Sequence, residues 1–127
     1  MLITGYVIAA VLSVAIAVLG VRFLLAPASA AAGYGVALGP DALTRRDLPA
    51  FLQVKGVRDI VSGLFIPVLI GFDQPHALAV IMLATTLTPL GDAAIVLRHG
   101  GTRAVAFGVH FATAVVMVLD AALLLLA

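Results

Sequence analysis

Three ionisable side chains lie deep inside long apolar stretches of this sequence. Asp59, Asp92 and His110 each lie within a run of about 20 or more residues that is rich in Leu, Val, Ile and Ala. A charge in the middle of a membrane costs about 2.5–3.5 kcal/mol on insertion scales, so such a residue usually faces a partner or a cavity. Two carboxyl groups whose pKa values are tuned apart, with a histidine as proton shuttle, can perform acid/base catalysis. These three residues are therefore our candidates for catalysis.

Basic and hydroxyl side chains accompany these three residues and could hold the polar group of a ligand. Lys55, Arg58, Asp59 and Ser62 fall at helical positions i, i+3, i+4 and i+7, which places them along one face. Arginine and lysine suit the polar head of a lipid, a quinone or a small acid. The candidate ligand-binding residues are Arg22, Lys55, Arg58, Ser62 and Thr88.

The same residues also have a purely structural interpretation. Lys55 and Arg22 could extend to the membrane interface, and Arg58 could form an ion pair with Asp92 between helices. A histidine that donates one hydrogen bond inside a bundle is more common than a catalytic histidine. Asp120, near the end of the last apolar run, is expected to be solvated. Glycines on the helix faces are expected to allow close packing.

Other kinds of site have little support in this sequence. Asp59, Asp92 and His110 lack the i, i+3 or i, i+4 spacing of helical metal ligands, so we expect no metal and no cofactor. Cysteine is absent, which excludes thiolate ligands and cysteine nucleophiles. A net charge of +1 gives no electrostatic reason to expect nucleic acid.

The composition predicts a membrane protein. Apolar residues make up 64% of the 127 residues and charged residues only 10%, whereas a soluble domain has about 25% charged residues. Water would drive so apolar a surface to associate, and lipid would not. The lipid bilayer is therefore the expected environment.

Four apolar runs predict an all-α membrane four-helix bundle with antiparallel, up-down topology and a single domain over 1–127. The expected spans are about 2–25, 50–71, 76–98 and 102–126, each near the ~20 residues that cross a bilayer. A short interfacial segment follows the first helix, where Asp41 could cap a short helix and Tyr34 would lie among the headgroups. Pro67 is expected to kink or end the second span.

The basic residues predict the orientation. All seven lie around the first and third connectors, which a four-span protein places on one side. By the positive-inside rule that side is cytoplasmic, so both termini lie outside the cytoplasm, and we expect the cell (inner) membrane. At 1.5 Å per residue, Asp59, Asp92 and His110 lie about 13, 9 and 12 Å from the cytoplasmic surface.

The sequence resembles a small four-span membrane family. The segments that carry the resemblance are KGVRDIVSG at 55–63, GVRFLLAP at 20–27, PLGD at 89–92 and His99-Gly100, with the Lys-Gly-Val-Arg-Asp run the most specific. The family is catalogued as domain of unknown function 4267 and looks related to the DoxX-like group. The resemblance implies a four-helix fold and the motif positions Arg22, Lys55, Gly56, Arg58, Asp59, Gly63, Gly91 and Asp92.

Three functional hypotheses follow from these observations. The first is a buried charged pocket in the cytoplasmic half that binds a small amphiphilic or isoprenoid-like ligand. The second is a cofactor-independent acid/base isomerase or cyclase that uses Asp59, Asp92 and His110. The third is an accessory subunit or scaffold of a larger membrane complex. The small-residue faces also allow a homo-oligomer without requiring one.

Overall fold

The structure is a computed structural model that describes residues 1–36, 38–42 and 44–127. Within these residues the chain consists of helices and of the turns and connectors between them. The all-α prediction is therefore confirmed. The helices, in chain order, are α1 (Leu2–Leu25), α2 (Pro27–Tyr34), α3 (Asp47–Gly71), α4 (Pro75–Thr85), α5 (Leu87–Arg98), α6 (Arg103–Val105), the π-helix η1 (Ala106–Phe111) and α7 (Ala112–Leu125).

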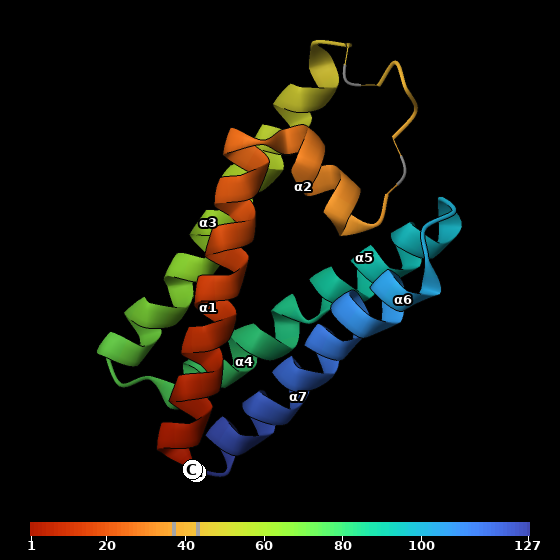
Figure 1. The fold of residues 1–127 in the computed structure, drawn as a ribbon. Helices are drawn as coiled ribbons and strands as arrows, with labels where there is room; N and C mark the ends of the chain where they lie inside the picture. The colour runs from red at the N-terminus through yellow and green to blue at the C-terminus, as the bar shows by residue number, and fades with distance from the viewer. Residues whose placement is uncertain (37, 43) are drawn as a thin grey trace.

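The helices form two arms that meet at one end and diverge at the other (Figure 1). One arm pairs α1 with α3, and the second pairs α4 and α5 with α6, η1 and α7. The arms join where α1 packs on α7, close to the C-terminus. At the divergent end, α2 lies between them. The fold therefore has a narrow, closed end and a wide end that α2 partly fills.

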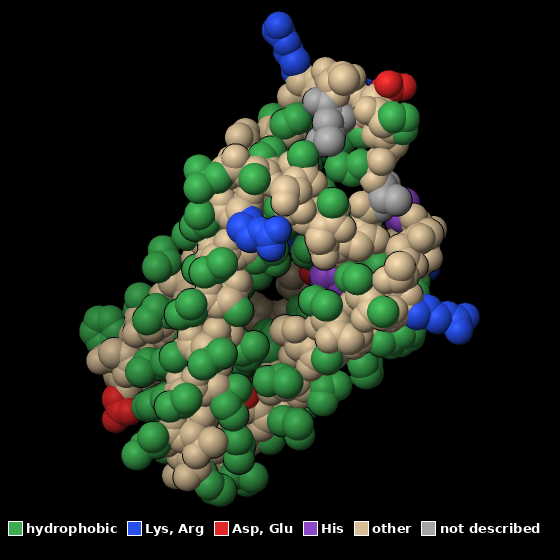
Figure 2. All heavy atoms as spheres, viewed as in Figure 1, with side chains coloured by type: hydrophobic (Ala, Val, Ile, Leu, Met, Phe, Trp, Pro, Cys, Tyr) green, Lys and Arg blue, Asp and Glu red, His purple; other side chains and the backbone are tan. Residues whose placement is uncertain are grey.

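Three helical stretches among the described residues are long and apolar enough to cross a membrane. They are Leu2–Leu25, Pro75–Arg98 and Arg103–Leu125. Hydrophobic side chains cover much of the face in Figure 2, and many large ones are exposed. These features indicate a membrane protein whose apolar faces suit contact with lipid. The 25-residue α3 is equally long but carries charges, and its crossing stays a prediction.

Small residues let α1 and α3 pack closely. Gly20 faces Gly56, and Ser13 donates a hydrogen bond of 2.7 Å to the carbonyl of Gly63. The residue numbers of α3 thus rise as those of the facing residues of α1 fall, so the two helices run in opposite directions. A Cβ atom on Gly20 would lie 2.6 Å from the backbone oxygen of Gly56. The expected close approach is therefore present at these glycines.

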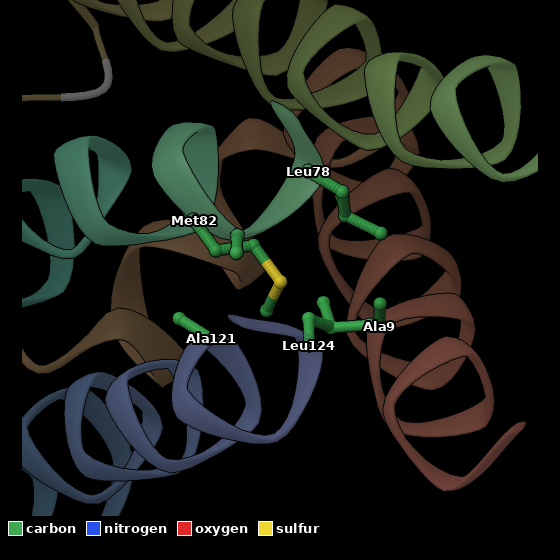
Figure 3. Packing of buried hydrophobic residues seen from close by; sticks show 6 residues of the cluster. Ala9, Leu78, Met82, Ala121 and Leu124 are labelled. Atoms are coloured by element: carbon green, nitrogen blue, oxygen red, sulfur yellow. The ribbon is translucent and has the colours of Figure 1, made fainter. Parts of the chain in front are cut away.

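The narrow end is held by an apolar core. Residues from α1, α4 and α7 meet there, and Figure 3 shows Leu78, Met82 and Leu124 pointing into the shared space. The buried members of this core are Ala9, Leu78, Ala79, Met82, Ala121 and Leu124. Their packing fixes the point from which the two arms diverge.

The first connector differs from the expectation. Its short helix is α2, which begins at Pro27, directly after α1, and ends at Tyr34, where Gly35 follows with a left-handed φ of 95°. Asp41 and Thr44 lie in turns, so Asp41 caps no helix, and Leu43 falls outside the described residues. Proline at the first position of α2 explains its start, because that position needs no backbone N–H donor.

Proline affects the second and third expected spans in different ways. Helix α3 continues through Pro67 to Gly71, so it does not end early, and the alternative expectation of a kink at Pro67 stays a prediction. The third run breaks at Thr86 into α4 and α5, just before Pro89. The Thr86 hydroxyl donates a 2.8 Å hydrogen bond to the carbonyl of Met82, a pattern that bends helices.

We predict that Gly20→Ala destabilises the protein, because the new methyl group would press on the backbone of Gly56. The expected loss is about 1–3 kcal/mol, measured as unfolding monitored by circular dichroism in detergent. Gly91→Ala on α5 is the matched control, because no atom of the described residues beyond its own helix backbone and chain neighbours lies within 4 Å of the place that its methyl group would take. Alanine at position 91 should raise the free energy of unfolding by as much as about 1 kcal/mol, because alanine has a higher helix propensity than glycine. Equal stability of the two variants would contradict the close packing of α1 on α3.

Candidate functional site

An ammonium group on α3 lies between a carboxylate and two aromatic rings. The Nζ atom of Lys55 donates to Oδ2 of Asp59, one helical turn away, at 2.5 Å. The same Nζ atom lies 4.7 Å from the ring centroid of Phe23 and 4.6 Å from that of Tyr34. Such distances allow cation–π attraction to both rings. The carboxylate and the two rings together compensate the charge of Lys55.

A histidine and a second carboxylate face this group from the other arm. Nδ1 of His110 lies 4.0 Å from Oδ2 of Asp92, which is too long for a direct hydrogen bond. The opposite ring nitrogen, Nε2, lies 3.0 Å from the backbone carbonyl oxygen of Tyr34. Since a carbonyl only accepts, Nε2 carries the proton of this hydrogen bond. In a neutral imidazole, Nδ1 therefore presents a lone pair toward Asp92.

A π-helical segment positions His110. Residues Ala106–Phe111 form one such turn between α6 and α7, and it leaves His110 only 5% exposed. The segment packs against α5, which carries Asp92. Short π-helical turns within α-helices are rare, and those that occur are frequently found at functional sites. This feature sets His110 apart from an ordinary buried histidine.

Helix α2 links the two arms through Tyr34. Its carbonyl is free to accept from His110, because the last carbonyls of a helix have no partner within the helix. The Tyr34 ring lies edge-on to the His110 ring, with centroids 4.6 Å apart. Burial and the nearby carboxylates of Asp92 and Asp59 raise the pKa of the Tyr34 phenol. The phenol is thus a neutral hydrogen-bond donor within the cluster.

We call Phe23, Tyr34, Lys55, Asp59, Asp92 and His110 the polar cluster. The structure brings together the three predicted catalytic residues and Lys55, from α3, α5 and η1. Sequence reasoning missed the roles of Phe23 and Tyr34. The sequence analysis places Tyr34 among the headgroups. One signal could have suggested a free carbonyl: Gly35 follows Tyr34, and glycine commonly ends helices.

The other candidate ligand-binding residues lie outside the polar cluster. Arg22, Arg58, Ser62 and Thr88 are exposed, and the Ser62 hydroxyl donates back to the carbonyl of Arg58. The proposed Arg58–Asp92 ion pair is wrong for the described residues, since Asp92 faces His110 instead. The residues of this stripe on α3 cannot all face the interior, because the contact between helices is narrower than the stripe. Whether the four residues contact a ligand stays a prediction.

An opening lies between the two arms. Figure 2 shows a dark hollow between the helices, with histidine and acidic side chains visible near its edge. Side-chain exposures of 30% for Lys55, 12% for Asp59 and 23% for Asp92 show that the cluster is only partly covered.

A separate apolar groove of about 290 Å³ lies between α4–α5 and α7, lined by Thr86, Leu90, Phe111, Ala114, Val115, Val118 and Leu119. No group of three or more potential metal ligands is found among the described residues.

Asp120 differs from its expectation. It is completely buried beside Gly5 and Leu124 at the narrow end, so the prediction of a solvated side chain is wrong. Neither carboxyl oxygen has a hydrogen-bond partner in the described part of the chain. An unpaired buried polar group costs about 1–3 kcal/mol. Asp120 lies in the apolar core and takes no part in the polar cluster.

Comparison with known proteins gives one match. The family model described as "Domain of unknown function (DUF4267)" matches residues 13–124, nearly the whole chain. The matched range includes every residue of the polar cluster. No curated protein and no solved structure matches the sequence.

We predict that Lys55→Met destabilises the protein far more than Arg58→Met. Loss of the ammonium would leave Asp59 without its partner, whereas Arg58 is exposed. Because Lys55 is partly exposed, the expected loss is about 1–3 kcal/mol, against less than about 0.5 kcal/mol for Arg58→Met. Chemical unfolding in detergent measures both values.

The double variant Lys55→Met/Asp59→Asn supplies the control for this prediction. It removes both charges, so it should recover part of the lost stability. Equal losses of stability in Lys55→Met and Arg58→Met would refute the assignment of Lys55, rather than Arg58, to the interior.

Proposed function

The chain belongs to the family of domain of unknown function 4267, and from that premise we propose that it is a small integral membrane protein that binds a small amphiphilic or isoprenoid-like ligand in its cytoplasmic half. The polar cluster would hold the polar group of this ligand. Apolar helix faces beside the opening would hold its tail. Assembly into larger complexes and a relation to the DoxX-like group stay predictions.

The gathering of ionisable groups from separate helices is the observation that carries this proposal. Lys55 and Asp59 come from α3, Asp92 from α5 and His110 from η1, and Tyr34 of α2 contacts both arms. Packing alone gives no reason to bring these groups together, because burying each of them is costly. A binding site for a polar group gives such a reason.

The proposed topology has four crossings, with α3 as the second. Lys55 and Asp59 pair with each other, so the polar residues of α3 impose less cost than their number suggests. With α3 included, the basic residues around the first and third connectors lie on one side. Both termini would then lie outside the cytoplasm. The proposal thus combines an antiparallel four-helix bundle with an opening at its cytoplasmic half.

The shape of the fold supports access from the bilayer. The two arms diverge toward the end that holds the polar cluster, and the hollow between them is bordered by apolar helices (Figures 1 and 2). An amphiphile could enter from the side, keeping its tail against apolar side chains while its head reaches Asp92 and His110. Binding sites commonly combine apolar walls with a few polar groups in this way.

We predict that the wild-type protein retains a small amphiphile through purification, identifiable by mass spectrometry of the extracted protein. Asp92→Asn should reduce its occupancy about tenfold or more, since a charge-assisted hydrogen bond contributes about 1.5–3 kcal/mol. The matched control is Asp41→Asn, the same substitution at an exposed residue of the first connector, which should leave occupancy unchanged.

Folding must be checked in the same preparation. Both variants should elute as monodisperse species with wild-type helicity. An amphiphile whose occupancy is the same in the wild type and in well-folded Asp92→Asn would count against a binding role for the polar cluster.

A second candidate function is acid/base catalysis, which the arrangement of Asp92 and His110 favours. The proton on Nε2 is fixed by Tyr34, and Nδ1 is free to accept a proton from a substrate. The neutral Tyr34 phenol could return a proton at another position. An isomerase of this kind would remove a proton from one carbon and deliver one to another, without net oxidation.

This enzyme hypothesis predicts that the protein exchanges carbon-bound hydrogen of a lipid with solvent. A membrane lipid extract incubated with the protein in D₂O would yield a lipid with increased mass. His110→Gln should abolish the increase, whereas Asp41→Asn should preserve it. An unchanged isotope pattern for every lipid with the wild-type protein would contradict catalysis and leave the binding role untouched.

A further inference from the structure

The charges of the polar cluster do not balance. With a neutral His110, the ionised carboxylates of Asp59 and Asp92 carry two negative charges, and Lys55 supplies one positive charge, which is already bonded to Asp59. Asp92 faces the His110 ring at 4.0 Å. An uncompensated carboxylate is costly away from water. One more positive charge next to Asp92 would therefore balance the charges of the site.

The groups that Asp92 and His110 present to each other are both hydrogen-bond acceptors. Nε2 of His110 donates to the Tyr34 carbonyl, so Nδ1 of the neutral ring accepts and faces a carboxylate that also accepts. His110 is 5% exposed, and no described residue forms a hydrogen bond to its Nδ1. An ammonium group carries several donors and no acceptor, so one such group can bond to both.

The aromatic side chains of the site already bind an ammonium group. Lys55 lies over the rings of Phe23 and Tyr34 while it bonds to Asp59. Carboxylates and aromatic faces are the groups that recognise amines. By contrast, Arg22 and Arg58, which would suit an anionic head, are exposed. The chemistry around Asp92 is that of a cation site.

We propose that the polar cluster binds the ammonium group of an amine-bearing amphiphile, between the carboxylate of Asp92 and Nδ1 of His110. This inference rests on the proposed function and names the class of ligand. Lys55 remains in its own position beside Phe23, Tyr34 and Asp59, and the ligand supplies the second positive charge. The tail of the amine extends along the apolar walls of the opening.

Three amphiphiles with the same tail test the proposal: dodecylamine, dodecanol and dodecanoate. Native mass spectrometry of the wild-type protein, released from detergent at equal probe concentrations, measures their binding. Dodecylamine should bind saturably and about tenfold or more tightly than the other two, because only it brings a positive charge to Asp92. This comparison uses the wild-type chain and does not depend on the folding of a variant.

Variants then locate the bound amine. Asp92→Asn should weaken dodecylamine binding about tenfold or more, while Asp41→Asn should leave it unchanged. Binding of dodecylamine that is indifferent to Asp92→Asn would overturn the assigned position. Preferred, Asp92-dependent binding of dodecanol or dodecanoate would overturn the ammonium class and leave the proposed function standing. Absence of saturable binding for all three amphiphiles to the wild-type protein would overturn both the ammonium class and the proposed function.

Discussion

The pairing of Lys55 with Asp59, beside the rings of Phe23 and Tyr34, is the interaction on which the rest of the site depends. Away from water a lysine ammonium must be compensated, and here a carboxylate and two aromatic faces share that role. The requirement draws α1, α2 and α3 together around one charge. It also leaves Asp92, on the other arm, as the carboxylate still available to a ligand or a proton.

Small residues and apolar packing set the geometry in which this charge compensation is possible. Gly20 and Gly56 bring α1 against α3, so that Phe23 can reach Lys55. At the narrow end, residues of α4 and α7 join the second arm to the first. The arms therefore diverge from a fixed point, and α2 fills part of the space between them. Tyr34, at the end of α2, meets groups from both sides because that space is wide enough to admit a helix.

Much of this arrangement follows from sequence, and the remainder depends on tertiary contacts. The long apolar runs predict the helices, because burial of backbone groups in lipid requires helical hydrogen bonding. The cost of burying Asp59, Asp92 and His110 correctly indicates that they gather. Helical spacing cannot decide which members of the stripe turn inward, so it does not separate Lys55 from Arg58.

Other features leave no periodic signal in the sequence. The π-turn at His110 is one such feature, and the partner of the Tyr34 carbonyl, His110, comes from a helix distant in the sequence. Asp120 escapes prediction because proximity to a helix end does not imply contact with water. In each case the deciding contact comes from a segment distant in the sequence, which local spacing cannot reveal.

Solid-state NMR of the protein in lipid bilayers tests the central claim most directly. The dipolar coupling between ¹⁵Nζ of lysine and ¹³Cγ of aspartate reports the Lys55–Asp59 pair, since Lys55 is the sole lysine of the chain. We predict a strong coupling that disappears in Asp59→Asn and persists in Asp47→Asn, because the side chain of Asp47 pairs with Arg45 and not with Lys55. A lysine signal without coupling to any aspartate, typical of a freely moving ammonium group in water, would contradict it.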